Sequence, residues 1–393
     1  MSITRAVVQV DELIKELGQP RAAFAYGVAM RELSHNWFLH TLLRLPIGPA
    51  LMQELAKAVA SSAPGGHKVW DSMASGTPKI VACIMNRSGE AGRPDETVMC
   101  TAADGGACRV VVEMKTEAAA YEAQLSKYVD AKRGRTEDDA AGLLLRIPGR
   151  DHVDMRHHAS MAGWQYLACI ESAIKSCDLD QDSRWLVEDY CRTLRFLDRL
   201  DVALMEQGNE LWSRLDATPK DSPANLWFED HWRWMEQRVV REVQSRTGGI
   251  VKWSSVAKDI KSDANGYFID FWPMPPEPLS LGTPGVGASY FAKWRQGSGL
   301  EIHVIVQNYD KPALQSPASL DLMDRLWSAG LEILPSLWAH AGKAGSKRPG
   351  ASRMVGRLEA HTYDVQEIVD MLQKELPPIY DVLASVVAKL RAG

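Results

Sequence analysis

The stretch "RVVVEMKTE", residues 109–117, begins as an apolar strand and ends in opposite charges. Three consecutive valines are typical of a buried β-strand. Side chains alternate between the two faces of a strand, so Glu113 and Lys115 point to one face and Met114 points to the other. The two charged side chains are therefore expected to emerge together near the end of the strand, where a sheet gives way to a cleft.

The segment before this strand predicts a partner strand and a tight turn. Residues 96–103, "ETVMCTAA", have the composition of a strand, and "DGGA" at 104–107 is a hairpin turn signal. The turn leads into the strand "CRVVVEMK", residues 108–115. Asp95 stands at the start of the first strand, so a hairpin returns Asp95 to the side of Glu113.

Two carboxylates and a backbone carbonyl at one strand end form a set of hard oxygen ligands. Asp95, Glu113 and the carbonyl of Met114 suit Mg²⁺ or Mn²⁺, which keep several waters and a phosphate oxygen as further ligands. Lys115 beside them can orient or deprotonate an attacking water and stabilise the charge that develops on phosphorus. These residue types therefore indicate hydrolysis of a phosphodiester bond.

Three short motifs follow one another along the chain: "RPD" at 93–95, "EMK" at 113–115 and "QLSKY" at 124–128. Their order and spacing resemble the PD-(D/E)XK nuclease superfamily, in the branch with a RecB-like Q-x-x-x-Y element. This resemblance implies an α/β fold with a restriction-endonuclease-like mixed sheet flanked by helices. It covers roughly residues 25–205.

Carried over residue by residue, the resemblance implies a catalytic and metal-binding site. Asp95 and Glu113 look like the two metal ligands of the family, and Lys115 looks like its catalytic lysine. Gln124 and Tyr128 are four residues apart, so they share one face of a helix. In the family this pair lies beside the active site and helps to position the lysine or the nucleic acid.

The segment "ELSHNWFLHTLLRLP", residues 32–46, resembles a feature of one bacterial branch of the superfamily. By that resemblance Glu32 is a further acid of the catalytic site, placed to hold a second metal ion. Proteins of this kind often act in bacterial anti-phage defence or DNA repair, so the resemblance implies such a setting.

The order of predicted elements divides the chain into three parts. Residues 1–158 are expected to form the nuclease core with N-terminal helices, residues 159–218 a helical extension packed on it, and residues 225–393 a C-terminal α+β domain. The segment "ATPKDSPAN", residues 217–225, has the composition of a linker.

Periodicity predicts the individual elements of each part. In the first two parts we expect helices at 3–17 and 21–60 with a break at 46–49, strands at 79–86 and 142–149, a helix at 116–133, and helices from about 160 to 218. In the last part we expect a helix at 226–244, strands at 266–272, 288–295 and 300–309, a basic loop at 340–353, and helices near 317–333 and 364–391.

Composition sets limits on the class of protein. The chain has 393 residues, 46% of them apolar and 24% charged, which is ordinary for a globular protein. A net charge of −5 argues against a protein that coats nucleic acid through bulk positive charge, yet it allows a local basic groove. Six cysteines without close metal spacing predict reduced thiols. The sequence lacks a long apolar run and an apolar N-terminus, which predicts a cytoplasmic protein without membrane contact.

Together these observations predict a Mg²⁺- or Mn²⁺-dependent (endo)deoxyribonuclease in which Lys115 orients the water that attacks the scissile phosphate. DNA is the expected partner, and a protein partner or a second copy is expected to bind through the C-terminal domain. The alternative is a nuclease-fold scaffold that acts as a binding or regulatory subunit, although such a scaffold has no physical need for Asp95, Glu113 and Lys115 together. A weaker third hypothesis is a metal hydrolase built on the His and Asp residues of 151–158.

Overall fold

The computed structural model describes residues 9–19, 32–60, 68–85, 94–115, 122–130, 139–147, 158–247, 252–253, 260–263, 266–271, 273–274, 279–280, 286–295, 299–308, 321, 325, 328, 352–359 and 362–392. The chain divides into two compact units, residues 1–203 with 218–231 and residues 204–217 with 232–393. The predicted helical extension, residues 159–218, contributes to both units, and one division between the units falls at 217/218, next to its predicted end.

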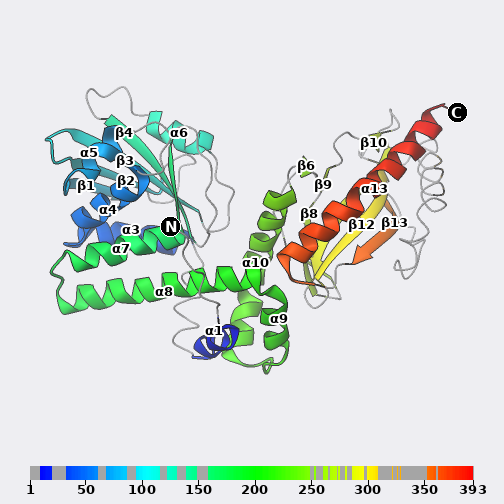
Figure 1. The fold of residues 1–393 in the computed structure, drawn as a ribbon, viewed down its shortest axis with the longest axis horizontal. Coiled ribbons are helices and arrows are strands. Elements are labelled where there is room, and N and C mark those ends of the chain that lie inside the picture. The colour runs from blue at the N-terminus through cyan, green and yellow to red at the C-terminus, as the bar shows by residue number, and fades with distance from the viewer. Residues whose placement is uncertain are drawn as a thin grey trace. The chain divides into compact units, whose positions relative to one another are not determined.

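The first unit is built on a five-stranded sheet with strand order β1-β2-β3-β4-β5 (Figure 1). Its strands are β1 (Lys79–Met85), β2 (Glu96–Thr101), β3 (Ala107–Lys115), β4 (Asp139–Arg146) and β5 (Ala159–Ala162). The first three strands pair antiparallel, and β3, β4 and β5 pair parallel. The mixed α/β sheet with flanking helices that the sequence predicted is therefore present.

A tight hairpin joins β2 to β3, as the turn signal predicted. The Ala102 N–H donates to the Gly106 carbonyl at 2.9 Å, and the Gly106 N–H donates to the Asp104 side chain at 2.8 Å. Gly105 has a φ of +88°, a conformation that residues with a Cβ rarely adopt. The resulting register runs from the Thr101–Ala107 pair to the Glu96–Val112 pair, which brings the start of β2 to the end of β3.

Helix α6 (Glu122–Asp130) connects β3 to its parallel neighbour β4 and covers one face of both strands. Its apolar side chains enclose a small core with residues of the two strands: Val111, Leu125, Tyr128, Val129 and Leu144. The Arg109 guanidinium near the start of β3 donates to the Val129 carbonyl near the end of α6 at 2.8 Å. The helix therefore runs back antiparallel to β3, and its first turn lies toward the strand end that carries Glu113 and Lys115.

The opposite face of the sheet is covered by helices from the N-terminal part of the chain. These are α3 (Glu32–Arg44), α4 (Gly48–Ala60) and α5 (Lys68–Ala74), and α1 (Val10–Leu17) precedes them. The predicted break is confirmed, because α3 ends at Arg44 and α4 begins at Gly48. The turn packs closely, since a Cβ at Gly48 would lie 2.2 Å from the Leu43 carbonyl oxygen. Helix α5 was not predicted. It spans only seven residues, too few for a periodic pattern to stand out.

Residues 159–218 differ from the prediction at their start. The segment expected to begin a helix opens with strand β5, and three helices follow within it: α7 (Gly163–Lys175), α8 (Gln181–Glu206) and α9 (Gly208–Asp216). Helix α10 (Pro223–Thr247) comes next, where the sequence predicted a helix at 226–244. The predicted linker is an ordered turn, in which the Asn225 amide donates to the carbonyls of Thr218 and Pro219 at 2.8 and 2.9 Å. Within the described residues, no helix combines the length and apolar character that a membrane span requires.

The second unit contains an antiparallel sheet with strand order β13-β12-β11-β8-β7, to whose strand β11 the short β10 adds. The elements described here are β6 (Lys252–Trp253), β7 (Ile260–Asp263), β8 (Gly266–Phe271), β9 (Pro273–Met274), β10 (Leu279–Ser280), β11 (Val286–Arg295), β12 (Gly299–Asn308), β13 (Ser352–Glu359) and α13 (Val365–Ala392). The α+β character predicted for the C-terminal part agrees with this arrangement. Strand β13 begins inside the predicted basic loop, and the predicted helix 317–333 lies outside the described residues except at three helical positions.

The turn at Gly105 allows a direct test of the hairpin. Gly105→Ala should lower the free energy of unfolding by about 1 kcal/mol, because a Cβ disfavours the left-handed backbone. Gly106→Ala is the matched control, since the φ of Gly106 lies outside that region. Urea unfolding measures both variants. Equal losses for the two would contradict the assigned turn.

Candidate functional site

Glu113 and Lys115 form a buried ion pair at the end of β3. The Lys115 Nζ lies 2.7 Å from Oε1 of Glu113, and the two residues are 9% and 4% exposed. They share the α6 face of the strand with Val111, which belongs to the α6 core. The structure therefore brings together the two side chains that strand alternation predicted to emerge on one face.

Asp95 joins this pair from the neighbouring strand. It immediately precedes β2, and its Oδ2 accepts a hydrogen bond from the Met114 backbone N–H at 2.7 Å. The N–H and C=O of one strand residue point to the same side, so the Met114 carbonyl is also directed toward β2. Asp95, Glu113, Lys115 and the Met114 backbone thus meet at one end of the sheet.

The helix α6 carries the two residues of the Q-x-x-x-Y element. Tyr128 is 7% exposed and packs in the core between α6 and strands β3 and β4. Gln124 lies one turn earlier in the helix, nearer the strand end with Lys115, and its side chain is outside the described residues. The structure places the backbone of this element beside the candidate site, and its role stays a prediction.

Glu32 is the first residue of α3, and its side chain also lies outside the described residues. Later in α3, His40 contacts Glu96 at the start of β2, and Arg44 approaches Cys83 in β1. Because β1 pairs antiparallel with β2, α3 runs antiparallel to β1 and its first turn lies toward the sheet end with Asp95. The backbone position of Glu32 is compatible with the predicted extra acid.

A second carboxyl next to Asp95 was not predicted. Glu96 is fully buried on the face of the sheet opposite Glu113, and its Oε2 lies 3.1 Å from Nδ1 of His40. Burial raises the pKa of Glu96 to about 8, a hydrogen bond from the Ile84 backbone lowers it, and the Asp95 carboxylate raises it again. Burial and then Arg44 lower the pKa of His40.

At neutral pH both shifts favour uncharged forms, so Glu96 and His40 share a hydrogen bond between neutral groups. This hydrogen bond connects α3 to the first residue of β2, which directly follows Asp95 in the chain. Strand alternation already predicts that the neighbouring side chains of Asp95 and Glu96 point to opposite faces of the sheet. The burial of Glu96 could not be predicted in this way, because it depends on the position of α3.

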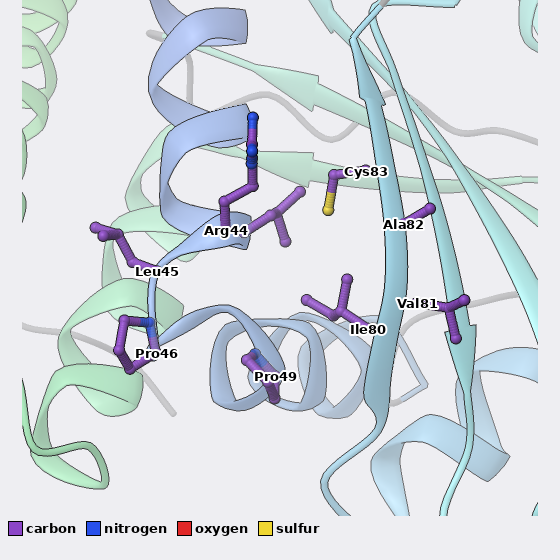
Figure 2. A pocket seen from close by; sticks show the side chains of 9 residues that line it. Arg44, Leu45, Pro46, Pro49, Ile80, Val81, Ala82 and Cys83 are labelled. Atoms are coloured by element: carbon purple, nitrogen blue, oxygen red, sulfur yellow. The ribbon is translucent and has the colours of Figure 1, made fainter.

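A pocket of about 700 Å³ lies between the end of α3, the start of α4 and strand β1. Arg44 is the charged residue of its lining, and Figure 2 shows Arg44 beside Cys83 and Pro49 beside Ile80. Burial raises the pKa of the Cys83 thiol to about 11, which keeps it protonated and unreactive at neutral pH. The lining contains none of the predicted site residues.

Two further predictions concern the cysteines, expected to be reduced thiols, and the histidine-rich segment 151–158, considered as an alternative metal site. All six cysteines are free thiols, as predicted, and four of them are buried. Of the segment 149–158 only His158 lies within the described residues, and its Nε2 is 2.8 Å from Oγ of Ser126 in α6. The predicted alternative of a metal site on 151–158 otherwise lies outside the described residues.

The donor set at the end of β3 fits a hard divalent cation. Among the residues that the structure describes, no group of three or more His, Cys, Asp and Glu side chains is arranged to hold a metal ion. Mg²⁺ needs no such group, because proteins usually bind it through one or two carboxylates with waters and substrate phosphates. Asp95 and Glu113 supply two carboxylates at neighbouring strand ends.

Comparison of the chain with protein-family models, with curated proteins and with solved structures returned no match.

The buried pair behind Asp95 predicts a pH dependence of stability. The pKa of Glu96 in the folded protein lies above its ordinary value of 4.5, so the stability that its protonated form supports is complete below about pH 4.5. That stability is lost as the pH rises toward 8. Relative to Glu96→Gln, the wild type should lose at most about 1.4 kcal/mol per pH unit over this window.

Unfolding free energies from urea titrations between pH 5 and 9 measure this difference. Glu54→Gln is the control, because the hydrogen bond from Lys57 lowers the pKa of Glu54 and its titration lies below this range. A wild-type and Glu96→Gln difference that stays constant with pH would rule out the raised pKa.

Proposed function

We propose that this protein is a Mg²⁺- or Mn²⁺-dependent nuclease of the PD-(D/E)XK type that hydrolyses phosphodiester bonds of DNA. The observation that carries the proposal is that Asp95, Glu113 and Lys115 lie together at one end of a mixed sheet. The strand that follows Asp95 and the strand that carries Glu113 and Lys115 are neighbours in this sheet, as the spacing of the motifs predicts. The helix with the Q-x-x-x-Y element returns along the same face, which supports the restriction-endonuclease-like form of the fold.

Each residue has a distinct task in this proposal. Asp95 and Glu113 hold the cation, with Glu32 as the further acid expected from the start of α3. When bound there, the cation would supply Lewis-acid stabilisation of the phosphate and of the leaving 3′ oxygen. The ion pair with Glu113 makes Lys115 an ammonium, which donates hydrogen bonds. Lys115 therefore suits the orientation of the attacking water and the stabilisation of phosphate charge better than the removal of a proton.

The burial of Glu113 and Lys115 supports a chemical role for their charges. A buried ion pair is not a cheap way to stabilise a fold, because the cost of desolvating both charges offsets their attraction. Apolar residues at positions 113 and 115 would continue the core of β3 equally well. The presence of a carboxylate and an ammonium there, next to a second carboxylate, supports a chemical role.

The proposal is tested by cleavage assays on double-stranded DNA, single-stranded DNA and RNA. Wild-type protein should cut DNA with Mg²⁺ or Mn²⁺ and lose the activity in EDTA, and Mg²⁺ should raise the thermal unfolding midpoint. Asp95→Asn and Glu113→Gln should abolish both effects. Asp189→Asn is the control, because Asp189 is a surface carboxylate paired with Arg192 at 2.7 Å.

If none of these substrates is cut and Mg²⁺ leaves the unfolding midpoint unchanged, the nuclease assignment fails. Tight binding to a protein partner in that case would support the scaffold alternative.

Substitutions at Lys115 separate its effect on DNA cleavage from its effect on the stability of the fold. Lys115→Ala should abolish cleavage and also cost on the order of 3–5 kcal/mol of stability, because Glu113 then keeps a buried charge without its ammonium. The double variant Lys115→Met with Glu113→Gln removes both charges, so it should fold with near-native stability and remain inactive. Chemical unfolding and single-turnover cleavage measure the two properties. Cleavage by Lys115→Ala at the wild-type rate would overturn the role of Lys115.

A further inference from the structure

Arg146 stands beside Lys115 on the adjacent strand. It is the last residue of β4, and the parallel register pairs it with Lys115. The Ile147 N–H donates to the Lys115 carbonyl at 3.0 Å, so this register holds up to the end of both strands. Neighbouring strands lie about 4.8 Å apart, which places the two cationic residues next to each other.

Both side chains belong to the same face of the sheet. Leu144 lies two residues before Arg146 and packs under α6 with Val111 of β3. Residues two apart on a strand share a face, so Arg146 follows Leu144 to the α6 face, as Lys115 follows Val111. No short sequence pattern identifies Arg146, because its position beside Lys115 depends on which strand becomes the neighbour of β3.

The burial of these residues changes from one strand to the next. Glu113 and Lys115 are almost fully buried, whereas Arg146 is partly exposed. Ser160 of β5 is also partly exposed and pairs with Leu144, so it continues the same face beyond β4. Two partly exposed polar residues, Arg146 of β4 and Ser160 of β5, therefore lie on this face beyond the candidate site.

We infer that Arg146 binds a backbone phosphate of the nucleic acid adjacent to the scissile phosphate, an inference that rests on the proposed nuclease function. A guanidinium is always charged and presents paired donors that match phosphate oxygens. Contacts to the phosphate backbone fix the register of the strand without reading its bases. Arg146 is thus a positioning residue that holds the strand while Asp95, Glu113 and Lys115 act on it.

Salt dependence of binding separates this role from a structural one, because each phosphate contact adds a fixed number of released counterions. Binding is measured in the Lys115→Met, Glu113→Gln double variant, which keeps the DNA uncut. The probes are a short fluorescent duplex and the corresponding single strand. Arg146→Gln should reduce the slope of log K against log salt by about 0.9 for the duplex or 0.7 for the single strand. Arg146→Lys should keep the slope.

In the otherwise wild-type protein, Arg146→Gln should lower kcat/KM for DNA cleavage by roughly 10- to 100-fold, as expected for loss of one charge-assisted hydrogen bond. Arg195→Gln is the matched control, since Arg195 is a surface arginine paired with Glu171 at 2.6 Å. It should leave the slope and the rate unchanged. If Arg146→Gln destabilises the fold, Arg146→Lys still tests the inference through reduced kcat/KM at an unchanged salt slope.

The outcomes are distinct. A wild-type protein that cuts DNA, with an unchanged salt slope in Arg146→Gln, overturns the inference and leaves the nuclease function standing. A wild-type protein that neither binds nor cuts any probe overturns both. A reduced slope in Arg146→Gln, with Arg195→Gln unchanged, supports the phosphate contact.

Discussion

The hydrogen bond from the Met114 N–H to the Asp95 carboxylate holds the start of β2 against the end of β3. It extends the β2–β3 ladder beyond its last paired residues, Glu96 and Val112, and it does so with a side chain in place of a backbone carbonyl. The geometry of the candidate site depends on this contact, because it sets Asp95 next to Glu113. The hairpin turn at Gly105 fixes the register, and the Glu96–His40 bond anchors the other face.

The sheet supplies a rigid frame for charges that are costly to bury. Glu113 and Lys115 lie under α6 in the continuation of an apolar core, where an unpaired charge would be strongly destabilising. Their mutual contact at 2.7 Å reduces that cost. In the proposed function, a bound cation would take the place of the Lys115 ammonium as the partner of the Glu113 carboxylate, and Lys115 would donate to a phosphate.

Local signals predicted several elements well, and for identifiable reasons. The valines of β3, the "DGGA" turn and the proline- and glycine-containing break between α3 and α4 each act over a few residues. Strand β5 was missed, because "ASMA" has no strand propensity of its own and extends only through pairing with β4. The Pro- and Ser-rich segment predicted as a linker forms a hydrogen-bonded turn between α9 and α10, and one division between the two units falls within it.

By itself the sequence determined that Glu113 and Lys115 share a face and that a hairpin brings Asp95 back to them, because alternation and turn chemistry are local properties of the backbone. Only the tertiary structure decided that this face lies under α6, that Glu96 is buried against His40, and that Arg146 stands beside Lys115. Those facts depend on which distant segments become neighbours. Parallel pairing of β3 with β4 is set by the crossover helix and the common core, which no short stretch of sequence contains.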